Sequence, residues 1–251
     1  MYDPRGSVWR KWDLQVQPIK HEWFTDLAAN QTSIEKATED YIKSAADSNI
    51  DVIALTDHIC GSAIDYAIEN DHGISILPGV ELDSREGWHI VVILNSRYKT
   101  KLELHSWSDT VDSFLSNVCQ IERPFHDEHG VAKIINITTE DLLTKLFAED
   151  IGIPIFAHCY SKDGFFKRGN VQSRRKILQL FKKKRTKYIF EIKDNTEHKK
   201  SVRKKILDYS KKKLPIPIIS STDAHQAKDV GKCFSWIKAD TEYEGLRQIL
   251  I

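Results

Sequence analysis

The segment 215–225 reads PIPIISSTDAH, an apolar run that ends in an acid and an imidazole. Its three isoleucines are β-branched and suit a buried strand, and its prolines stand at the start, where a missing N–H does least harm. The polar residues therefore follow the carboxyl end of the strand, the edge where parallel α/β folds bind ligands. Asp223 and His225 would project from one face and could share a metal ion, although a turn with an Asx cap is an alternative.

The same arrangement recurs along the chain. DVIALTDH (51–58) ends in Asp57 and His58, GISILPGVEL (73–82) carries Glu81 just behind a Pro-Gly break, WHIVVIL (88–94) begins with His89, and GIPIFAHCY (152–160) carries His158. Predicted helices at 33–48, 62–70, 109–119, 139–148, 171–183 and 197–210 alternate with these strands and with YIFEIK (188–193). This alternation predicts a parallel sheet, open or closed.

The first predicted strand, 12–17, carries polar residues on one face. Alternation along it predicts Asp13, Gln15 and Gln17 on that face and the apolar side chains on the other. By contrast, FHDEHG (125–130) is predicted to be a loop, so His126 and His129 are expected on the surface. The two glutamines are thus candidates to lie among the strand-end residues.

Length and composition favour one domain spanning residues 1–251. No linker rich in glycine or proline divides the 251 residues, and no apolar run is long enough to span a membrane. The four cysteines are far apart and form no paired spacing of a structural zinc or redox site. A reduced, cytoplasmic setting is the simplest expectation.

The net charge of +1 hides an asymmetry. Segment 162–213 holds 20 Lys and Arg against 5 Asp and Glu, and the rest of the chain holds 17 against 31. Such a basic segment could bind a phosphate backbone, but solvated outer helix faces would look the same. The candidate DNA or RNA contacts in this segment are Lys167, Arg168, Arg174, Arg175, Lys182, Lys183 and Lys184.

The strand-end residues suit metal-dependent phosphoester chemistry. Imidazoles and carboxylates together bind zinc, manganese or iron, and a carboxylate such as Glu81 can bridge two ions. Such ions stabilise the attacking and leaving oxygens of a phosphoryl centre and activate water. Hydrolysis of phosphate esters is therefore the expected reaction.

Five ordered motifs carry a resemblance to a known family. TDH (56–58), GVEL (79–82), WHI (88–90), AHCY (157–160) and STDAH (221–225) resemble the polymerase and histidinol phosphatase (PHP) family. WRKWDL (9–14) and EGLRQIL (244–250) are similar to the TrlF group, in which a PHP domain precedes an SMC-like ATPase. The resemblance implies a distorted (β/α)7 barrel with its active site and up to three divalent ions at the carboxyl ends of the strands.

The same resemblance implies a wider context. The chain would be the amino-terminal part of a longer, homo-oligomeric protein with a carboxyl-terminal ATPase domain, since no GxxxxGK loop occurs in it. The TrlF group also implies a role in bacterial defence against phage.

One motif departs from the family pattern. Gln15 and Gln17 stand where the family has two histidines, and a neutral amide is a weak metal ligand. Carried over residue by residue, the resemblance implies one position with only Glu81 and Asp223, an intact position of Glu81, His89 and His158, and a partial one with His58 and His225. One or two ions are therefore expected. Asp57, His58 and His225 form the implied catalytic group, with Asp57 orienting a neighbouring ligand.

Three hypotheses follow. The first is a metal-dependent nuclease whose basic segment holds DNA or RNA. The second is a catalytically degenerate PHP domain, weakened at Gln15 and Gln17, that binds nucleic acid and regulates an attached ATPase. The third is a small-molecule phosphatase, favoured if the acidic remainder of the surface excludes long polyanions.

Overall fold

The computed structural model describes residues 8–162, 164–183, 187–193 and 216–250. Its strands form one eight-stranded sheet in the order β7-β6-β5-β4-β3-β2-β1-β8. The strands are β1 (Trp9–Val16), β2 (Val52–Leu55), β3 (Ser75–Asp83), β4 (His89–Leu94), β5 (Gly152–Phe156), β6 (Ile189–Glu191), β7 (Ile218–Ile219) and β8 (Ser235–Lys238). Strand and helix alternate along most of the chain, as the sequence predicts.

The sheet is a nearly closed, distorted barrel. Strands β1, β2 and β3 are parallel, as are β5, β6 and β7, whereas β4 is antiparallel to both neighbours and β8 is antiparallel to β1. The chain just beyond β7 reaches β1, because Ala224 N donates to Gln15 O at 3.2 Å and Gln17 N donates to Ala224 O at 3.0 Å. The predicted barrel class is confirmed, but the expectation of an entirely parallel sheet was wrong.

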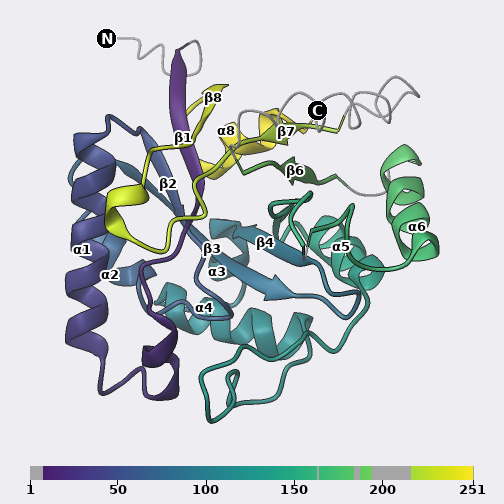
Figure 1. The fold of residues 1–251 in the computed structure, drawn as a ribbon, viewed down its shortest axis with the longest axis horizontal. Helices are drawn as coiled ribbons and strands as arrows, with labels where there is room; N and C mark the ends of the chain where they lie inside the picture. Colours follow the sequence, from purple (N-terminus) through teal and green to yellow (C-terminus); the bar gives the residue numbers. More distant parts are fainter. Residues whose placement is uncertain (1–7, 163, 184–186, 194–215, 251) are drawn as a thin grey trace.

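Helices surround the sheet, with α1 and α6 at opposite sides of the molecule (Figure 1). Several begin at side-chain caps, for example α5, where the Thr138 hydroxyl accepts from Asp141 N at 3.1 Å. The helices are η2 (His21–Thr25), α1 (Gln31–Asp47), α2 (Ile64–Glu69), α3 (Ser96–Lys101), α4 (Trp107–Ser113), the π-helix η3 (Phe114–Val118), α5 (Thr139–Ala148), α6 (Val171–Lys182), η4 (Ala227–Asp229) and α8 (Tyr243–Gln248). The predicted helix 197–210 lies outside the described residues.

Alternation along the strands divides the buried residues into two clusters. One fills the barrel and includes Leu77, Val91 and Ile155, and the other packs between the sheet and the helices and includes Val80, Val92 and Phe156. Glu81 and His89 share strand faces with Leu77 and Val91 respectively. Their side chains therefore lie above the apolar filling of the barrel.

An irregularity in β1 changes which residues face the barrel. The register with β2 shifts between Asp13 and Val16, which indicates a bulge. Gln15 and Gln17 consequently reach Glu81, whereas Asp13 bonds to Thr222 and Gly231. The expectation that all three polar residues share one face was wrong, because alternation does not continue through a bulge.

The Pro-Gly pair predicted as a break lies inside β3. Pro78 pairs with Leu55 of β2, and Gly79 pairs with Ile93 of β4. A Cβ atom at Gly79 would lie 3.1 Å from the carbonyl oxygen of Val92, so glycine permits a close approach of the two strands. The pair therefore continues the strand and keeps Glu81 in register.

Candidate metal centre

Glu81 occupies the centre of the candidate site. Its side chain, from β3, is 1% exposed, and one of its oxygens together with a nitrogen of His89 and one of His158 forms a set of atoms within 4.8 Å of one another. Burial raises the pKa of Glu81, but the imidazoles of His58, His158 and His89 more than offset this and hold it well below its ordinary value. Glu81 is therefore an ionised carboxylate facing a group of imidazoles.

Asp83 orients His89, and sequence reasoning missed it. Asp83 Oδ1 lies 3.0 Å from His89 Nε2, while His89 Nδ1 lies 3.1 Å from Glu81 Oε1. Burial lowers the pKa of His89, yet contacts with Asp83 and Glu81 raise it to about 10. Asp83 lies two residues beyond Glu81 on the same strand face, and that spacing was the available signal. A carboxylate behind an imidazole is the usual support for a metal-binding histidine.

His158 is held from two sides. Its Nδ1 lies 2.6 Å from the Ser161 hydroxyl, which leaves Nε2 facing Glu81 Oε1 at 3.7 Å. Its backbone N–H donates to Glu191 Oε2 at 2.5 Å, and its φ of 27° is in the left-handed region that a side chain rarely adopts. Burial raises the pKa of Glu191 to about 8. Glu191 thus supports a strained residue, and sequence reasoning missed it.

The set Glu81, His89 and His158 fits a divalent transition metal. One carboxylate and two imidazoles are a known donor set for zinc. Glu81 Oε1 is buried and makes no hydrogen bond of good geometry within the described residues, although two imidazole nitrogens lie close to it. The three groups therefore face a common point rather than pairing fully with one another. The structure brings these three predicted ligands together.

The position at Gln15 and Gln17 does not fit a metal ion. Gln15 Nε2 donates to Glu81 Oε2 at 3.0 Å, and Gln17 Nε2 donates to the same oxygen. Gln15 Oε1 is buried and has no hydrogen-bond partner among the described residues. Both amides thus direct N–H groups at the carboxylate where a metal would need lone pairs. Asp223, the other carboxylate that the resemblance implies at this position, is paired with Lys193 and His225.

Asp223 is bound by a lysine and a histidine. Lys193 Nζ lies 2.9 Å from Asp223 Oδ2, and His225 Nε2 lies 3.4 Å from Oδ1. Burial raises the pKa of Asp223, but His225 and Lys193 lower it below its ordinary value, and Asp223 in turn raises the pKa of His225. Lys193, which sequence reasoning missed, thus belongs to the edge where the predicted ligands lie.

His58 and Asp57 follow β2 at the same edge. His58 Nε2 lies 3.8 Å from Glu81 Oε2, so His58 borders the site. Asp57 accepts the backbone N–H of Ile19 at 2.9 Å, and burial raises its pKa to about 7. This hydrogen bond ties Asp57 to the chain after β1. Its predicted role of orienting a neighbouring ligand stays a prediction.

The expectation that His126 lies on the surface was wrong, whereas the same expectation for His129 is confirmed. His126 is 7% exposed, stacks on Phe24 with ring centroids 4.3 Å apart, and lies within 2.9 Å of the His58 carbonyl oxygen through Nε2. It therefore supports the loop that carries His58. His129 is exposed, as expected.

The predicted nucleic-acid residues that the structure describes lie just before α6, along it and at its end. Arg168 lies close to Gly87 in the loop that precedes His89, and Arg174 bonds to the carbonyl oxygens of Arg168 and Gly169 at 3.0 Å. Lys182 is about 12 Å further along the helix axis than Arg174. Lys167, Arg175, Lys182 and Lys183 are exposed, whereas Lys184 lies outside the described residues.

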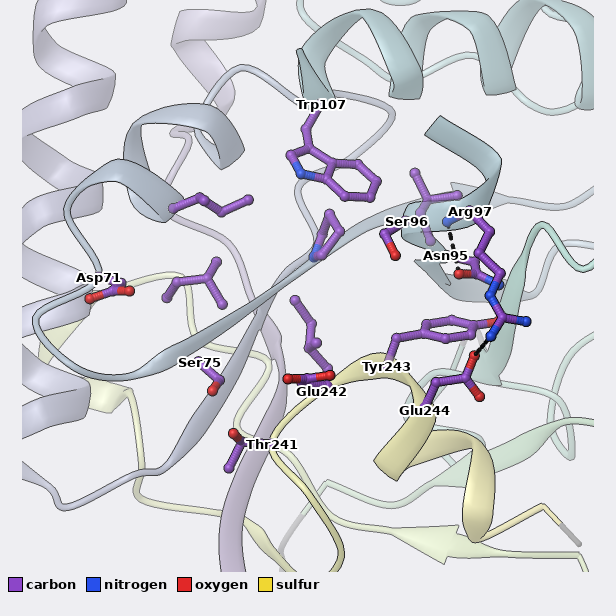
Figure 2. Close-up of a pocket in the computed structure, with 15 residues that line it drawn as sticks. Asp71, Ser75, Asn95, Ser96, Arg97, Trp107, Thr241, Glu242, Tyr243 and Glu244 are labelled. Atoms are coloured by element: carbon purple, nitrogen blue, oxygen red, sulfur yellow. Dashed lines mark hydrogen bonds and ion pairs between the residues drawn. The ribbon is translucent and has the colours of Figure 1, made fainter. Parts of the chain in front are cut away.

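A cavity of about 480 Å³ lies at the other edge of the sheet (Figure 2). It opens between the start of β3, the end of β4 and the beginning of α8. Asp71, Glu242 and Glu244 line it, and its arginine, Arg97, is paired with Glu244 at 3.3 Å. The cavity is separate from the candidate metal centre, because it lies at the opposite ends of β3 and β4, and its acidic lining does not suit a phosphate ester.

Comparison with solved structures finds the same fold in an endonuclease and in a putative metal-dependent phosphoesterase. The lesion-specific endonuclease EndoQ from Pyrococcus furiosus matches 97% of this chain and 56% of its own, with a TM-score of 0.63 and 15% identity. Endonuclease Q in complex with a 27-mer duplex containing an abasic lesion matches 96% and 56%, with a TM-score of 0.62 and 13% identity. The fold is shared. This chain spans only about half of the endonuclease.

A third structure is of similar size to this chain. The putative metal-dependent phosphoesterase from Bifidobacterium adolescentis matches 95% of each chain, with a TM-score of 0.51 and 11% identity. No family model and no curated protein matches the sequence. The described residues include no helix long and apolar enough to cross a membrane.

Proposed function

We propose that this chain is a metal-dependent phosphoesterase of the PHP type that cleaves phosphodiester bonds in DNA or RNA. The convergence of Glu81, His89 and His158 at the carboxyl edge of the barrel carries the proposal. The fold shared with Endonuclease Q over almost the whole chain supports it. An ion bound by these residues would act as a Lewis acid on the phosphoryl group and lower the pKa of a water molecule.

The chain's own residues would supply the remaining functions. Glu81 and the two imidazoles would hold the ion, with Asp83 and Ser161 fixing the rings. His58 and His225 lie at the same edge and carry ring N–H groups that can donate to phosphate oxygens or transfer a proton to a leaving group. Arg168 and Arg175, near the start of α6, favour a polymeric substrate over a small phosphate ester.

The second candidate is a degenerate domain that binds nucleic acid and regulates an attached SMC-like ATPase. The bonding of the Gln15 and Gln17 amides to Glu81 favours it, because this position lacks metal-binding imidazoles. A role in defence against phage and assembly into homo-oligomers belong to this wider proposal, which treats residues 1–251 as one part of a longer protein.

A cleavage assay tests the proposal. The protein reconstituted with Mn²⁺ or Zn²⁺ is incubated with single-stranded DNA, duplex DNA, RNA and a phosphomonoester. The native protein is expected to cleave at least one polymer. His89→Ala should abolish this cleavage, and His129→Ala, the control at an exposed residue, should retain it. Hydrolysis of the phosphomonoester alone would contradict the nuclease proposal and favour a small-molecule phosphatase.

If no substrate is cleaved, the hypothesis of a catalytically degenerate domain is favoured. In that case Gln15→His with Gln17→His should restore turnover if missing imidazoles are the cause. Nucleic-acid binding without cleavage by the native chain, together with such restoration, would support the regulatory domain. Absence of bound metal after reconstitution would contradict both the nuclease and the phosphatase.

A further inference from the structure

Lys193 lies two residues beyond Glu191, the last residue of β6, on the same barrel-facing side of the chain. Residues two apart in an extended segment share a face, and the bond from Ile192 N to Ile219 O at 3.0 Å keeps this segment beside β7. Glu191 is buried, whereas the Lys193 side chain is 54% exposed. The ammonium group therefore lies at the mouth of the barrel, 2.9 Å from Asp223 Oδ2.

Asp223 is satisfied without a metal ion. One of its oxygens pairs with Lys193 and the other faces His225 Nε2 at 3.4 Å. Its side chain is only 12% exposed, so a carboxylate at this depth needs a positive partner. Lys193 supplies that charge from the chain itself.

Glu81 is also satisfied on the side that faces Gln15 and Gln17. Both amides donate to Oε2. The buried Oε1 atom of Gln15 has no hydrogen-bond partner among the described residues, so this amide presents its N–H group to Glu81 and leaves its oxygen unused. At the position between Glu81 and Asp223, the side chains of Gln15 and Gln17 therefore act as hydrogen-bond donors, and Lys193 supplies a positive charge.

We propose that Lys193, with the amides of Gln15 and Gln17, replaces the metal ion that Glu81 and Asp223 would otherwise share, and that its ammonium group binds a phosphate oxygen of the substrate. A lysine ammonium has three N–H donors, of which Asp223 takes one. The other two donors belong to a side chain that is 54% exposed, so they can bind an anion at the same edge of the barrel. Phosphate binding by Lys193 rests on the proposed function, whereas the replacement of the ion does not.

Metal binding tests the replacement. Titration of MnCl2 into metal-free protein by calorimetry should give one ion per chain. In the background Gln15→His with Gln17→His, adding Lys193→Ala should tighten a second Mn²⁺ at least about tenfold, because a positive charge beside Asp223 has been removed. Equal second-ion affinity with and without Lys193 would overturn the replacement.

Phosphate binding tests the second half. Inorganic phosphate titrated into the Mn²⁺-loaded protein should bind about tenfold more weakly to Lys193→Met and close to normally to Lys193→Arg. Lys232→Met, at an exposed lysine paired with Asp229 at 2.7 Å, is the matched control and should have no effect. Unchanged phosphate affinity in Lys193→Met, with one ion still bound, would overturn this half.

The two measurements separate this inference from the proposed function. Neither requires turnover, so the expected metal and phosphate results in a chain that cleaves nothing would retain the replacement and remove the phosphoesterase. Cleavage that is indifferent to Lys193 would retain the phosphoesterase and remove phosphate binding by Lys193. The retained single ion in each Lys193 variant shows that the variant is folded.

Discussion

His89 Nδ1 lies 3.1 Å from Glu81 Oε1, although the two residues belong to strands that run in opposite directions. The antiparallel pairing of β3 and β4 places the start of β4 beside the end of β3, with His89 opposite Asp83. A histidine at the beginning of a strand thereby reaches the edge where the other predicted ligands follow strand ends. The direction of β4 is therefore a condition for the candidate metal centre.

Removing the carboxylate behind His89 should weaken metal binding. Asp83→Ala is expected to lower Mn²⁺ or Zn²⁺ affinity roughly 10- to 100-fold, since His89 loses the group that fixes its ring. Asp83→Asn should have a smaller effect, because its amide oxygen can still accept. Calorimetric titration measures this, with the exposed Glu128→Ala as control, and equal affinity in Asp83→Ala would contradict the orienting role of Asp83.

Glu191 should act through hydrogen bonding rather than charge. Glu191→Ala leaves the backbone N–H of His158 without its acceptor and should lower the free energy of unfolding by about 1–3 kcal/mol. Glu191→Gln offers an amide oxygen and should stay close to the native protein. Urea unfolding compares the two. A glutamine variant as unstable as the alanine variant would show that the carboxyl group matters for another reason.

The aromatic cluster around Phe165, in the connection after His158, should be a large contributor to stability. Phe165 is fully buried, and its ring centroid lies 4.9 Å from that of Trp88 and 4.7 Å from that of Phe156. Phe165→Ala should cost about 3–5 kcal/mol in urea unfolding. Phe147→Ala, at a half-exposed phenylalanine, should cost far less. Similar losses in both variants would contradict the packing role.

Asp13 should make stability depend on pH. Burial raises its pKa from 3.8 to about 6, although bonds from Thr222 and Gly231 oppose the shift. The folded protein keeps this proton to a higher pH than the unfolded chain does, so the free energy of unfolding falls as pH rises from about 4 to about 6. Asp13→Asn should remove this dependence.

Urea unfolding between about pH 4.5 and pH 7 measures the effect. The stability of the native protein relative to Asp13→Asn should fall by about 2 kcal/mol over this interval, since one pKa unit corresponds to about 1.36 kcal/mol. Parallel stability curves for the two proteins would mean that Asp13 titrates normally in the folded state.

Position along α6 should determine the contribution of each basic residue to nucleic-acid binding. Arg175→Glu, in the first half of the helix, should weaken DNA affinity and reduce the slope of log K against log salt by about 0.9 for each phosphate that is no longer neutralised. Lys182→Glu makes the same kind of charge change about 10 Å further along the helix and should have a smaller effect. Fluorescence anisotropy across a salt series distinguishes them, and equal losses of affinity would indicate a non-specific charge effect.

Local patterns in the sequence were enough to predict an α/β sheet and its strand ends, whereas the barrel was implied by the family resemblance. Helix 139–148 agrees with α5, and Glu81, His89 and His158 do meet. The direction of β4 could not be predicted, because a strand's periodicity is the same whichever way it runs. In a fully parallel sheet His89 would lie at the opposite edge, so periodicity alone gave no reason for its place.

The residues that support the candidate ligands were harder to predict from the sequence than the ligands themselves. Asp83 could have been found from its spacing to Glu81, but His126 and Lys193 lie in loops or beyond strand ends, where no period constrains them. The bulge in β1 likewise separates Asp13 from Gln15 without a marker such as glycine or proline. These features depend on tertiary contacts between distant segments, which local propensity does not encode.

The backbone bonds between Ala224 and the segment Gln15 to Gln17 also bear on when the barrel can close during synthesis. They join residues that are synthesised about ten seconds or more apart, at roughly 5–20 residues per second. Until Ala224 has emerged from the ribosome, β1 lacks this partner, and Asp223 and His225 cannot join the edge of the barrel. The edge that holds the candidate metal centre is therefore complete only when nearly the whole chain has been synthesised.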